Sequence, residues 1–297
     1  MEGKAKQENV IIINSLCKSY GKVKAVKDLS FSVKRGEIFG FLGPNGAGKT
    51  TTIRVLMGQI FQDEGNFQIL GINNGVRSDT KLMDEIGYIS GEGYIYENWS
   101  ARRLFEYLSS ISHKQIEFDS FADRLDLDLD RKISELSSGN KQKVLLVQAF
   151  MKMPKLLILD EPTSGLDPLL QNIFEEMLFE FRENGGTVLL SSHILSEVQR
   201  VCDRVGIIRQ GELIKVSTIG ELIPKTYFLK LWVDDELPSD LMNLLPDMKA
   251  EGQGRYHAKY LGDINQLINL LAKLKIKHLT ISEPKLEEMF LELYNEK

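Results

Sequence analysis

Residues 43–50 read Gly-Pro-Asn-Gly-Ala-Gly-Lys-Thr and fit the pattern G-x-x-x-x-G-K-[ST] without a mismatch. An apolar stretch, residues 36–42, precedes this loop, and a helical pattern begins near Lys49. Glycines in such a loop let successive backbone N–H groups converge on phosphates at a helix amino end, where the helix dipole also favours anions. A strand, a glycine loop and a helix in this order therefore predict an α/β fold built around a phosphate site.

The chemistry of this loop predicts ATP and Mg²⁺ as ligands. Lys49 would reach the β and γ phosphates, and the Thr50 hydroxyl would ligate Mg²⁺. The alternative, a chance glycine turn, is disfavoured by the flanking strand and helix. The full set of expected nucleotide contacts in this segment is Gly43, Pro44, Asn45, Gly46, Ala47, Gly48, Lys49, Thr50 and Thr51.

A second motif, which is acidic, follows the apolar residues 156–159. Asp160 and Glu161 there end a predicted buried strand. Asp160 would hold Mg²⁺ from a second side, and Glu161 would polarise the attacking water. Taken alone, two acids at the end of a strand describe a solvated strand end. Together with the phosphate loop, they favour a nucleotide-hydrolysing site.

Short apolar segments separated by helical patterns predict a doubly wound sheet. Alternation over residues 10–34, with a turn around Tyr20, suggests two antiparallel edge strands. The expected strands of the sheet are residues 36–42, 86–89, 156–159, 187–190 and 205–208. The expected helices are residues 101–111, 118–124 and 138–151, which form a helical subdomain inserted at about residues 94–153.

Three divisions of the chain are expected from composition. Residues 1–9 read as a disordered tail, residues 10–224 as the ATPase domain, and residues 225–297 as a small α+β domain in which strands and helices alternate. No stretch reaches the roughly 18 to 20 apolar residues needed to cross a bilayer. The amino terminus lacks the apolar region of a signal peptide.

Composition narrows the function classes. The 297 residues carry a net charge of −5, with an isoelectric point near 5.6, which argues weakly against a general nucleic-acid binder. Cys17 and Cys202 lie far apart without a partner motif, which predicts two reduced thiols in a cytosolic protein. The acidic net charge therefore predicts that the chain has no nucleic-acid partner.

Residues 136–142, Leu-Ser-Ser-Gly-Asn-Lys-Gln, resemble the L-S-G-G-Q signature of ATP-binding cassette (ABC) proteins, with Ser138 and Asn140 as departures. The resemblance covers the chain from about residue 10 onward. It is specific because several unlike motifs occur in the expected order: the signature, then Asp160-Glu161, then Ser164-Gly165-Leu166-Asp167, then Ser191-Ser192-His193.

The resemblance implies further roles. Tyr20 resembles the aromatic that stacks on adenine, although the position also suits a surface aromatic beside a turn glycine. Ser137 and Gly139 resemble the cradle that closes on the γ phosphate of ATP held by a partner cassette. Asp167 resembles the residue that couples the two sites, and His193 resembles the switch histidine that contacts the γ phosphate. Two nucleotides would then be sandwiched between two copies of the cassette.

One position departs from the family. After residues 86–89 the family usually carries Gln or Glu near the metal and the attacking water, and here Gly91 occupies that place. Either Glu92 takes over by a one-residue shift, or water fills the place.

Residues 94–99, Tyr-Ile-Tyr-Glu-Asn-Trp, are rich in aromatics. In the resembled transporters this region receives a coupling helix of the membrane subunit, and the neighbouring Arg102 and Arg103 suit such an interface. The alternative is that the rings only pack the helical subdomain. The acidic run at residues 126–130 lacks the glycine and terminal Glu of a calcium loop and is expected to be a solvated turn.

The resemblance implies an ATP-hydrolysing subunit of a transporter, located in the cytoplasm and peripheral on the inner face of the cell membrane. Its expected partners are a membrane-spanning permease on a separate chain and a second cassette. Residues 284–293 resemble the carboxy end of bacterial drug, antibiotic and peptide exporters. An importer cassette and a soluble non-transport ATPase remain alternatives. We expect the helix at residues 286–294 to form a dimer contact.

Overall fold

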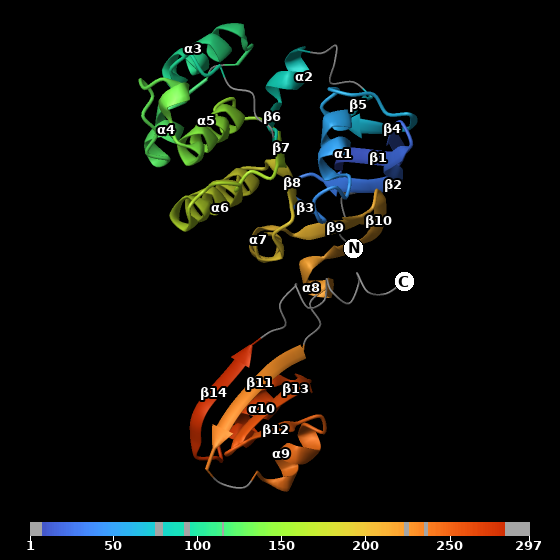
Figure 1. Cartoon of the computed structure of the whole chain (residues 1–297), viewed down its shortest axis with the longest axis vertical. Coiled ribbons are helices and arrows are strands. Elements are labelled where there is room, and N and C mark those ends of the chain that lie inside the picture. Colours follow the sequence, from blue (N-terminus) through green and yellow to red (C-terminus); the bar gives the residue numbers. More distant parts are fainter. Residues whose placement is uncertain are drawn as a thin grey trace, which may run out of the picture. The chain divides into compact units, whose positions relative to one another are not determined.

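The computed structural model describes residues 8–74, 80–91, 96–114, 116–222, 226–234 and 237–282, and Figure 1 shows the chain coloured along its sequence. The chain divides into two compact units, Met1–Ser217 and Thr218–Lys297. The division lies before the expected boundary at residue 224. It coincides with the end of β10 (Glu212–Thr218), the last strand along the chain that belongs to the main sheet.

The main sheet of the first unit has six strands in the order β10-β9-β3-β8-β7-β6. Its five parallel strands are β9 (Arg204–Arg209), β3 (Ile38–Leu42), β8 (Thr187–Ser192), β7 (Leu156–Asp160) and β6 (Ile86–Ile89). Every residue of β3, β7 and β8 is buried, as expected for strands covered on both faces. The two-residue turn Gln210-Gly211 joins β9 to β10, which is consequently antiparallel.

The amino-terminal strands form a second sheet, which corrects the expectation that they would be edge strands of the first. The sheet contains β1 (Asn9–Tyr20), β2 (Val23–Lys34), β4 (Glu64–Ile69) and β5 (Ile72–Asn73), in the order β2-β1-β4-β5. β1 is already paired on both sides, with β2 and β4, so it cannot join the parallel sheet. The two sheets instead share a core in which the Phe31 ring stacks on Phe39 at 5.2 Å.

The ordered chain starts slightly earlier than expected. The expected tail was residues 1–9, but β1 begins at Asn9 and the carbonyl of Glu8 accepts a hydrogen bond from the N–H of Arg35 at 2.8 Å. Pairing with the end of β2 therefore includes Glu8 and Asn9 in the fold. Residues 1–7 lie outside the described residues.

Helices cover the parallel sheet and form the inserted subdomain. They are α1 (Lys49–Leu56), α2 (Thr80–Asp84), α3 (Ala101–Ile111), α4 (Asp119–Arg124), α5 (Ser138–Phe150), α6 (Pro168–Glu183) and α7 (Leu195–Val201), with a 3-10 turn at Ile133–Glu135. Figure 1 shows α3, α4 and α5 grouped together, away from the antiparallel sheet. A side chain at Gly87 of β6 would lie 2.2 Å from the carbonyl of Ala149, so glycine allows α5 to pack directly on this strand.

The second unit starts with α8 (Ile219–Leu222) and contains a four-stranded antiparallel sheet with its own core. The elements that follow α8 are β11 (Thr226–Val233), α9 (Ser239–Leu244), β12 (Lys249–Gly252), β13 (Arg255–Leu261), α10 (Ile264–Leu271) and β14 (Ile276–Ser282), and the sheet order is β12-β13-β11-β14. Leu231, Leu241 and Leu267 are at most 2% exposed and belong to one cluster. The sequence missed the β12–β13 hairpin. The expected final helix at residues 286–294 lies outside the described residues.

Candidate functional site

The loop between β3 and α1 surrounds the ammonium group of Lys49. Its Nζ atom donates to the carbonyls of Gly43 at 2.6 Å and Pro44 at 3.2 Å, and the residue is only 5% exposed. Gly48 caps the helix with φ of 110° and no side-chain acceptor, so the first N–H groups of α1 keep no cap partner. A side chain at Gly48 would lie 2.5 Å from the carbonyl of Ala25, which excludes other residues there.

Asp160 ends β7 and is fully buried. Its Oδ1 atom accepts a hydrogen bond from the hydroxyl of Ser191, the matching residue of the neighbouring strand β8. Its Oδ2 atom is buried and has no hydrogen-bond partner among the described residues. A buried carboxylate oxygen without a partner is costly unless a ligand satisfies it.

Glu161 follows in a left-handed conformation, with φ of 52°. Its N–H donates to the carbonyl and the hydroxyl of Ser191, both at 3.2 Å. Residues other than glycine adopt this backbone conformation at a cost, and such residues gather at functional sites. The turn directs the carboxylate back across the carboxyl end of the sheet.

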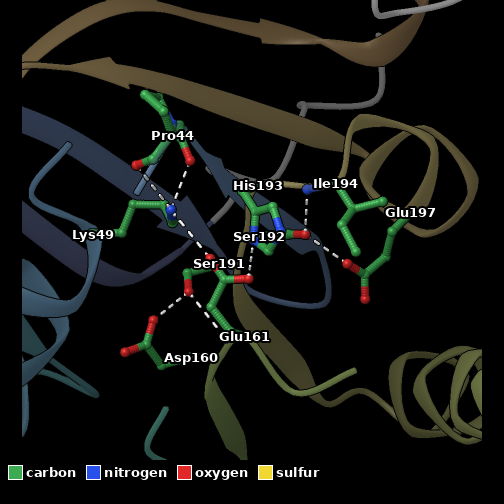
Figure 2. A network of polar contacts seen from close by, with 10 residues as sticks. Pro44, Lys49, Asp160, Glu161, Ser191, Ser192, His193, Ile194 and Glu197 are labelled. Atoms are coloured by element: carbon green, nitrogen blue, oxygen red, sulfur yellow. Dashed lines mark hydrogen bonds and ion pairs between the residues drawn. The ribbon is translucent and has the colours of Figure 1, made fainter. Parts of the chain in front are cut away.

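The carboxylate of Glu161 joins three segments that are far apart in the sequence. Its Oε1 atom lies 3.1 Å from Nζ of Lys49, and its Oε2 atom lies 2.6 Å from Nδ1 of His193. Figure 2 shows these side chains converging from α1, from the end of β7 and from the end of β8. The structure thus brings together the lysine, acid and histidine that the sequence motifs predicted.

Two adjoining hollows open at this cluster. One, of about 300 Å³, is lined by Ala25, Asn45, Gly46, Ala47, Gly48, Lys49, Thr50, Thr51 and Glu161. The other, of about 410 Å³, is lined by Asn45, Thr50, Gly91, Glu161, Ser164 and His193. Ala25 and Ser164 were not predicted from the sequence as lining residues. Ser164 could have been found, because it belongs to the motif at residues 164–167.

Thr50 and Asp160 fit the predicted Mg²⁺ site. Thr50 lines both hollows, and the partnerless Oδ2 of Asp160 is an oxygen of the type that Mg²⁺ prefers. A Cβ atom at Gly91 would lie 3.5 Å from this same oxygen, which is ordinary contact distance. The backbone of residue 91 therefore borders the predicted metal position but supplies no ligand side chain. Glu92, the alternative ligand, lies outside the described residues.

The signature segment does not line either hollow. Ser137 caps α5 by accepting from the N–H of Asn140 at 3.3 Å, and Gly139 lies close to the carbonyl of Gly165. Asp167 caps α6, accepting from the N–H of Leu170 at 3.0 Å. Within one chain, helix capping and packing are thus the roles of Ser137, Gly139 and Asp167, and none of the three lines the two hollows.

Tyr20 is likewise not a lining residue. It ends β1, is 49% exposed, and has the Nζ of Lys18 5.9 Å from its ring centre. Its predicted stacking on adenine remains a prediction.

Part of the aromatic segment forms a half-exposed cluster. The ring of Tyr96 stacks on Trp99 at 4.8 Å, Tyr107 packs edge-on against Trp99 at 5.5 Å, and the guanidinium of Arg103 lies 4.7 Å from the Trp99 ring. Tyr96 is 58% exposed. Tyr94 and Ile95 lie outside the described residues.

The acidic run at residues 126–130 is used within the subdomain. Asp128 accepts from the N–H of Asp130, and Asp130 pairs with Arg102 at 2.7 Å. Cys17 and Cys202 are both free thiols, and burial raises the pKa of Cys202. In the part of the chain that the structure describes, no helix has the length and apolar character needed to span a bilayer.

Comparison with known proteins shows which family this chain resembles. Residues 26–164 match the family described as ABC transporter. The chain is 32% identical to the linearmycin resistance ATP-binding protein of Bacillus subtilis, over 93% of this chain and 95% of the relative. It is also 32% identical to the bacitracin transport ATP-binding protein of Bacillus licheniformis, over 96% and 97% of the two chains.

A solved structure described as the ATP-binding subunit of an ABC transporter superposes with a TM-score of 0.67 at 28% identity. It covers 72% of this chain and 91% of that chain. A cassette solved as a dimer in a post-hydrolysis state with ADP and Pi has the same fold, with a TM-score of 0.64 at 20% identity, over 70% and 98% of the two chains.

Proposed function

This chain belongs to the ATP-binding proteins of ABC transporters, and we propose that it hydrolyses ATP at the site formed by Lys49, Asp160, Glu161 and His193. The observation that carries the proposal is the convergence of Lys49 and His193 on the one carboxylate of Glu161. Phosphoryl transfer to water requires a cation for the phosphates and a carboxylate for the water. Here the cation lies 3.1 Å from the carboxylate and a histidine lies 2.6 Å from it.

Binding of the triphosphate would change the partners of Lys49. The β and γ phosphate oxygens would replace the carboxylate of Glu161 as its anionic contact, while the backbone N–H groups of the loop and of α1 would donate to the phosphates. Glu161 would then be free to accept a hydrogen bond from water facing the γ phosphate. As a general base it would take the proton of that water during the attack.

The histidine and the metal ligands complete the proposed site. His193 would contact a γ phosphate oxygen through its imidazole and remain within reach of Glu161. Thr50 and Asp160 would hold Mg²⁺, which would neutralise charge on the β and γ phosphates. Glu161 and Asp160 would have different tasks, because Glu161 lines both hollows whereas Asp160 is fully buried.

We also propose that hydrolysis requires two copies of the chain. Ser137 and Gly139 lie outside both hollows of their own chain, so in the family arrangement they would close on ATP held by the other copy. In the family arrangement, transport would depend on a membrane subunit supplied by another chain, with this subunit on the cytoplasmic face.

The proposed direction of transport is export of a drug, antibiotic or peptide. This rests on the relatives named for linearmycin resistance and bacitracin transport, which align along nearly their whole length. Nod factor export is named for a third relative, from Rhizobium sp., 31% identical over 93% of this chain and 94% of the relative. Copurification of the membrane partner from the native cell would decide between an exporter and an importer.

The first test of the proposed function is phosphate release by the purified protein with Mg²⁺ and ATP. Lys49→Ala should abolish productive ATP binding and turnover, because it removes the charge that pairs with the phosphates. Lys24→Ala, which changes an exposed lysine of β2, is the matched control and should behave like the wild type. Undiminished nucleotide affinity and turnover of the Lys49 variant would refute the assignment.

A further inference from the structure

Glu197 is a buried carboxyl group that the proposed steps do not use. It lies on α7 and is 3% exposed. Burial raises its pKa against the hydroxyls of Ser192 and Thr163, which lower it, and the carboxylates of Glu161 and Glu175 raise it further. A buried acid is destabilising unless its polar atoms are bonded. The Oε1 atom of Glu197 has no hydrogen-bond partner among the described residues, so the bond that Oε2 makes indicates the role of the residue.

Those contacts fix the turn that carries His193. The hydroxyl of Ser192 donates to Oε2 of Glu197 at 2.6 Å, and the same hydroxyl accepts the N–H of Ile194 at 2.9 Å. Ile194 is the N-cap of α7 and provides no side-chain cap of its own. Figure 2 shows that Ser192 and Ile194 flank His193 in this turn.

The placement of the His193 ring depends on this backbone turn. The side chain of His193 is 46% exposed, so surrounding packing restrains the ring only in part. Its Nδ1 atom lies 2.6 Å from Oε2 of Glu161. Ser192 is 1% exposed, so its bond to Glu197 lies where water does not compete. Hydrogen bonds in such surroundings are stronger than exposed ones.

We infer that Glu197 is a positioning residue for ATP hydrolysis: by holding Ser192 it holds the backbone of His193, and thereby directs the imidazole at Glu161 and the γ phosphate. Glu197 does not touch the nucleotide hollows. The inference rests on the proposed function, which supplies the reaction that is measured.

The kinetic test compares Glu197→Ala with Glu197→Gln. The alanine variant should lower kcat about 10- to 100-fold, because small misplacements of reacting groups have effects of this size, and it should leave KM for ATP unchanged. The glutamine variant keeps an oxygen that accepts from Ser192 and should restore most of kcat. Glu175→Gln is the matched control, since Glu175 of α6 pairs at 2.6 Å with Arg200 of α7, the helix that carries Glu197. Its kcat should equal that of the wild type.

Ser192→Ala tests the route of the effect and replaces Glu197→Ala if that variant does not fold. Ser192→Ala also loses the bond from the N–H of Ile194. If Glu197 acts through Ser192, the double variant should therefore have the same kcat as Ser192→Ala. Multiplied losses in the double variant would overturn the inference. So would equal losses in the alanine and glutamine variants of Glu197, since these would point to the charge or the packing rather than to the bond with Ser192.

The NMR signal of the His193 imidazole gives a readout that needs no turnover. The chain has four histidines, so His193→Ala identifies the signal in the nucleotide-free protein. The signal should shift in Glu197→Ala and Ser192→Ala, but not in Glu197→Gln or Glu175→Gln. An unmoved signal in both alanine variants would overturn the inference even if the wild type hydrolyses ATP. A shifted signal would support placement of the His193 ring by Glu197 even if the wild type failed to hydrolyse ATP, a failure that would refute the proposed function.

Discussion

The Nζ atom of Lys49 lies 3.1 Å from Oε1 of Glu161, so the group expected to bind phosphates is paired with the group expected to activate water. Their side chains are 5% and 20% exposed, so solvent screens the pair only weakly. ATP must therefore compete with an internal carboxylate for Lys49. The same exchange would release Glu161 for catalysis, which links binding of the substrate to activation of the base.

Glu161→Gln should separate the two consequences of this pair. A neutral amide holds Lys49 less strongly, so ATP affinity should be equal to or higher than that of the wild type. Hydrolysis should fall by roughly 10² to 10⁴ if the carboxylate is the general base. Binding of a fluorescent ATP analogue and phosphate release measure the two effects.

The same variant should accumulate an ATP-bound dimer, visible as a doubled mass in light scattering, because the closed state is no longer emptied by hydrolysis. Glu64→Gln, at an exposed position of β4, is the control and should leave mass and turnover unchanged. Wild-type turnover in the Glu161 variant would mean that another residue activates the water.

Gly91→Gln should tighten the dependence of hydrolysis on Mg²⁺. The position borders Oδ2 of Asp160 with room for a Cβ atom at 3.5 Å, so a glutamine there could present its amide oxygen to the metal. The expected result is half-maximal activity at a lower Mg²⁺ concentration, measured by titrating Mg²⁺ at fixed ATP. An unchanged titration would show that residue 91 does not reach the metal.

Glu92→Ala tests the other possibility for this place. If Glu92 is the ligand by a one-residue shift, its loss should weaken Mg²⁺-dependent hydrolysis and leave Mg²⁺-free nucleotide binding nearly intact. No change in Mg²⁺ dependence would favour water at the metal.

Asp84→Asn should destabilise the larger unit in a pH-dependent way. Desolvation by burial raises the pKa of Asp84, but Lys152, the N–H of His113 and the Ser112 hydroxyl lower it more, so the folded pKa lies below the ordinary value. The carboxylate therefore stabilises the fold above the unfolded pKa of about 3.9, and this contribution is lost as pH falls through the folded pKa.

The expected cost of Asp84→Asn at pH 7 is about 1 to 3 kcal/mol, because residue 84 is buried and its partners keep a weaker acceptor. Urea unfolding of the variant and the wild type measures it, and the two curves should approach each other below pH 4. Asp123→Asn, at an exposed position of α4, is the control. A difference that persists unchanged at pH 3 would contradict the electrostatic explanation.

Strong local patterns in the sequence predicted most of the larger unit. Residues 101–111 and 86–89 coincide with α3 and β6, because the periodicity and the strand context are both clear. The sequence did not reveal that β1 belongs to a second sheet, since pairing of β1 with β4 joins residues about 50 positions apart. The β12–β13 hairpin was missed because the exposed residues of β12 carry no alternating apolar pattern.

The site residues were predictable where a motif of fixed spacing carries them. Lys49, Asp160 and His193 follow from such motifs. Two features follow only from three-dimensional packing: the left-handed backbone of Glu161 and the hydrogen bond between Ser192 and Glu197. A glutamate four residues after a histidine has no meaning of its own in a sequence until the turn between them is known.

The last prediction concerns the smaller unit. Every residue assigned to ATP chemistry lies at or before Glu197, and the cluster that includes Leu231, Leu241 and Leu267 gives the smaller unit a core of its own. Truncation after Pro224 should therefore spare ATP binding. We expect it to shift the nucleotide-free protein toward monomer and to impair transport, because the dimer contact predicted for residues 286–294 is lost.

A second truncation, after Ser282, assigns the effect. It keeps the strands and helices described for the smaller unit and removes only residues 283–297. If residues 286–294 hold two cassettes together while ATP is absent, both truncations should give the same monomer fraction in sedimentation velocity. A dimer that survives truncation after Ser282 but not truncation after Pro224 would place the contact within β11 to β14 or their helices. A protein truncated after Pro224 that still dimerises without nucleotide and supports full export would contradict any role of the smaller unit in assembly.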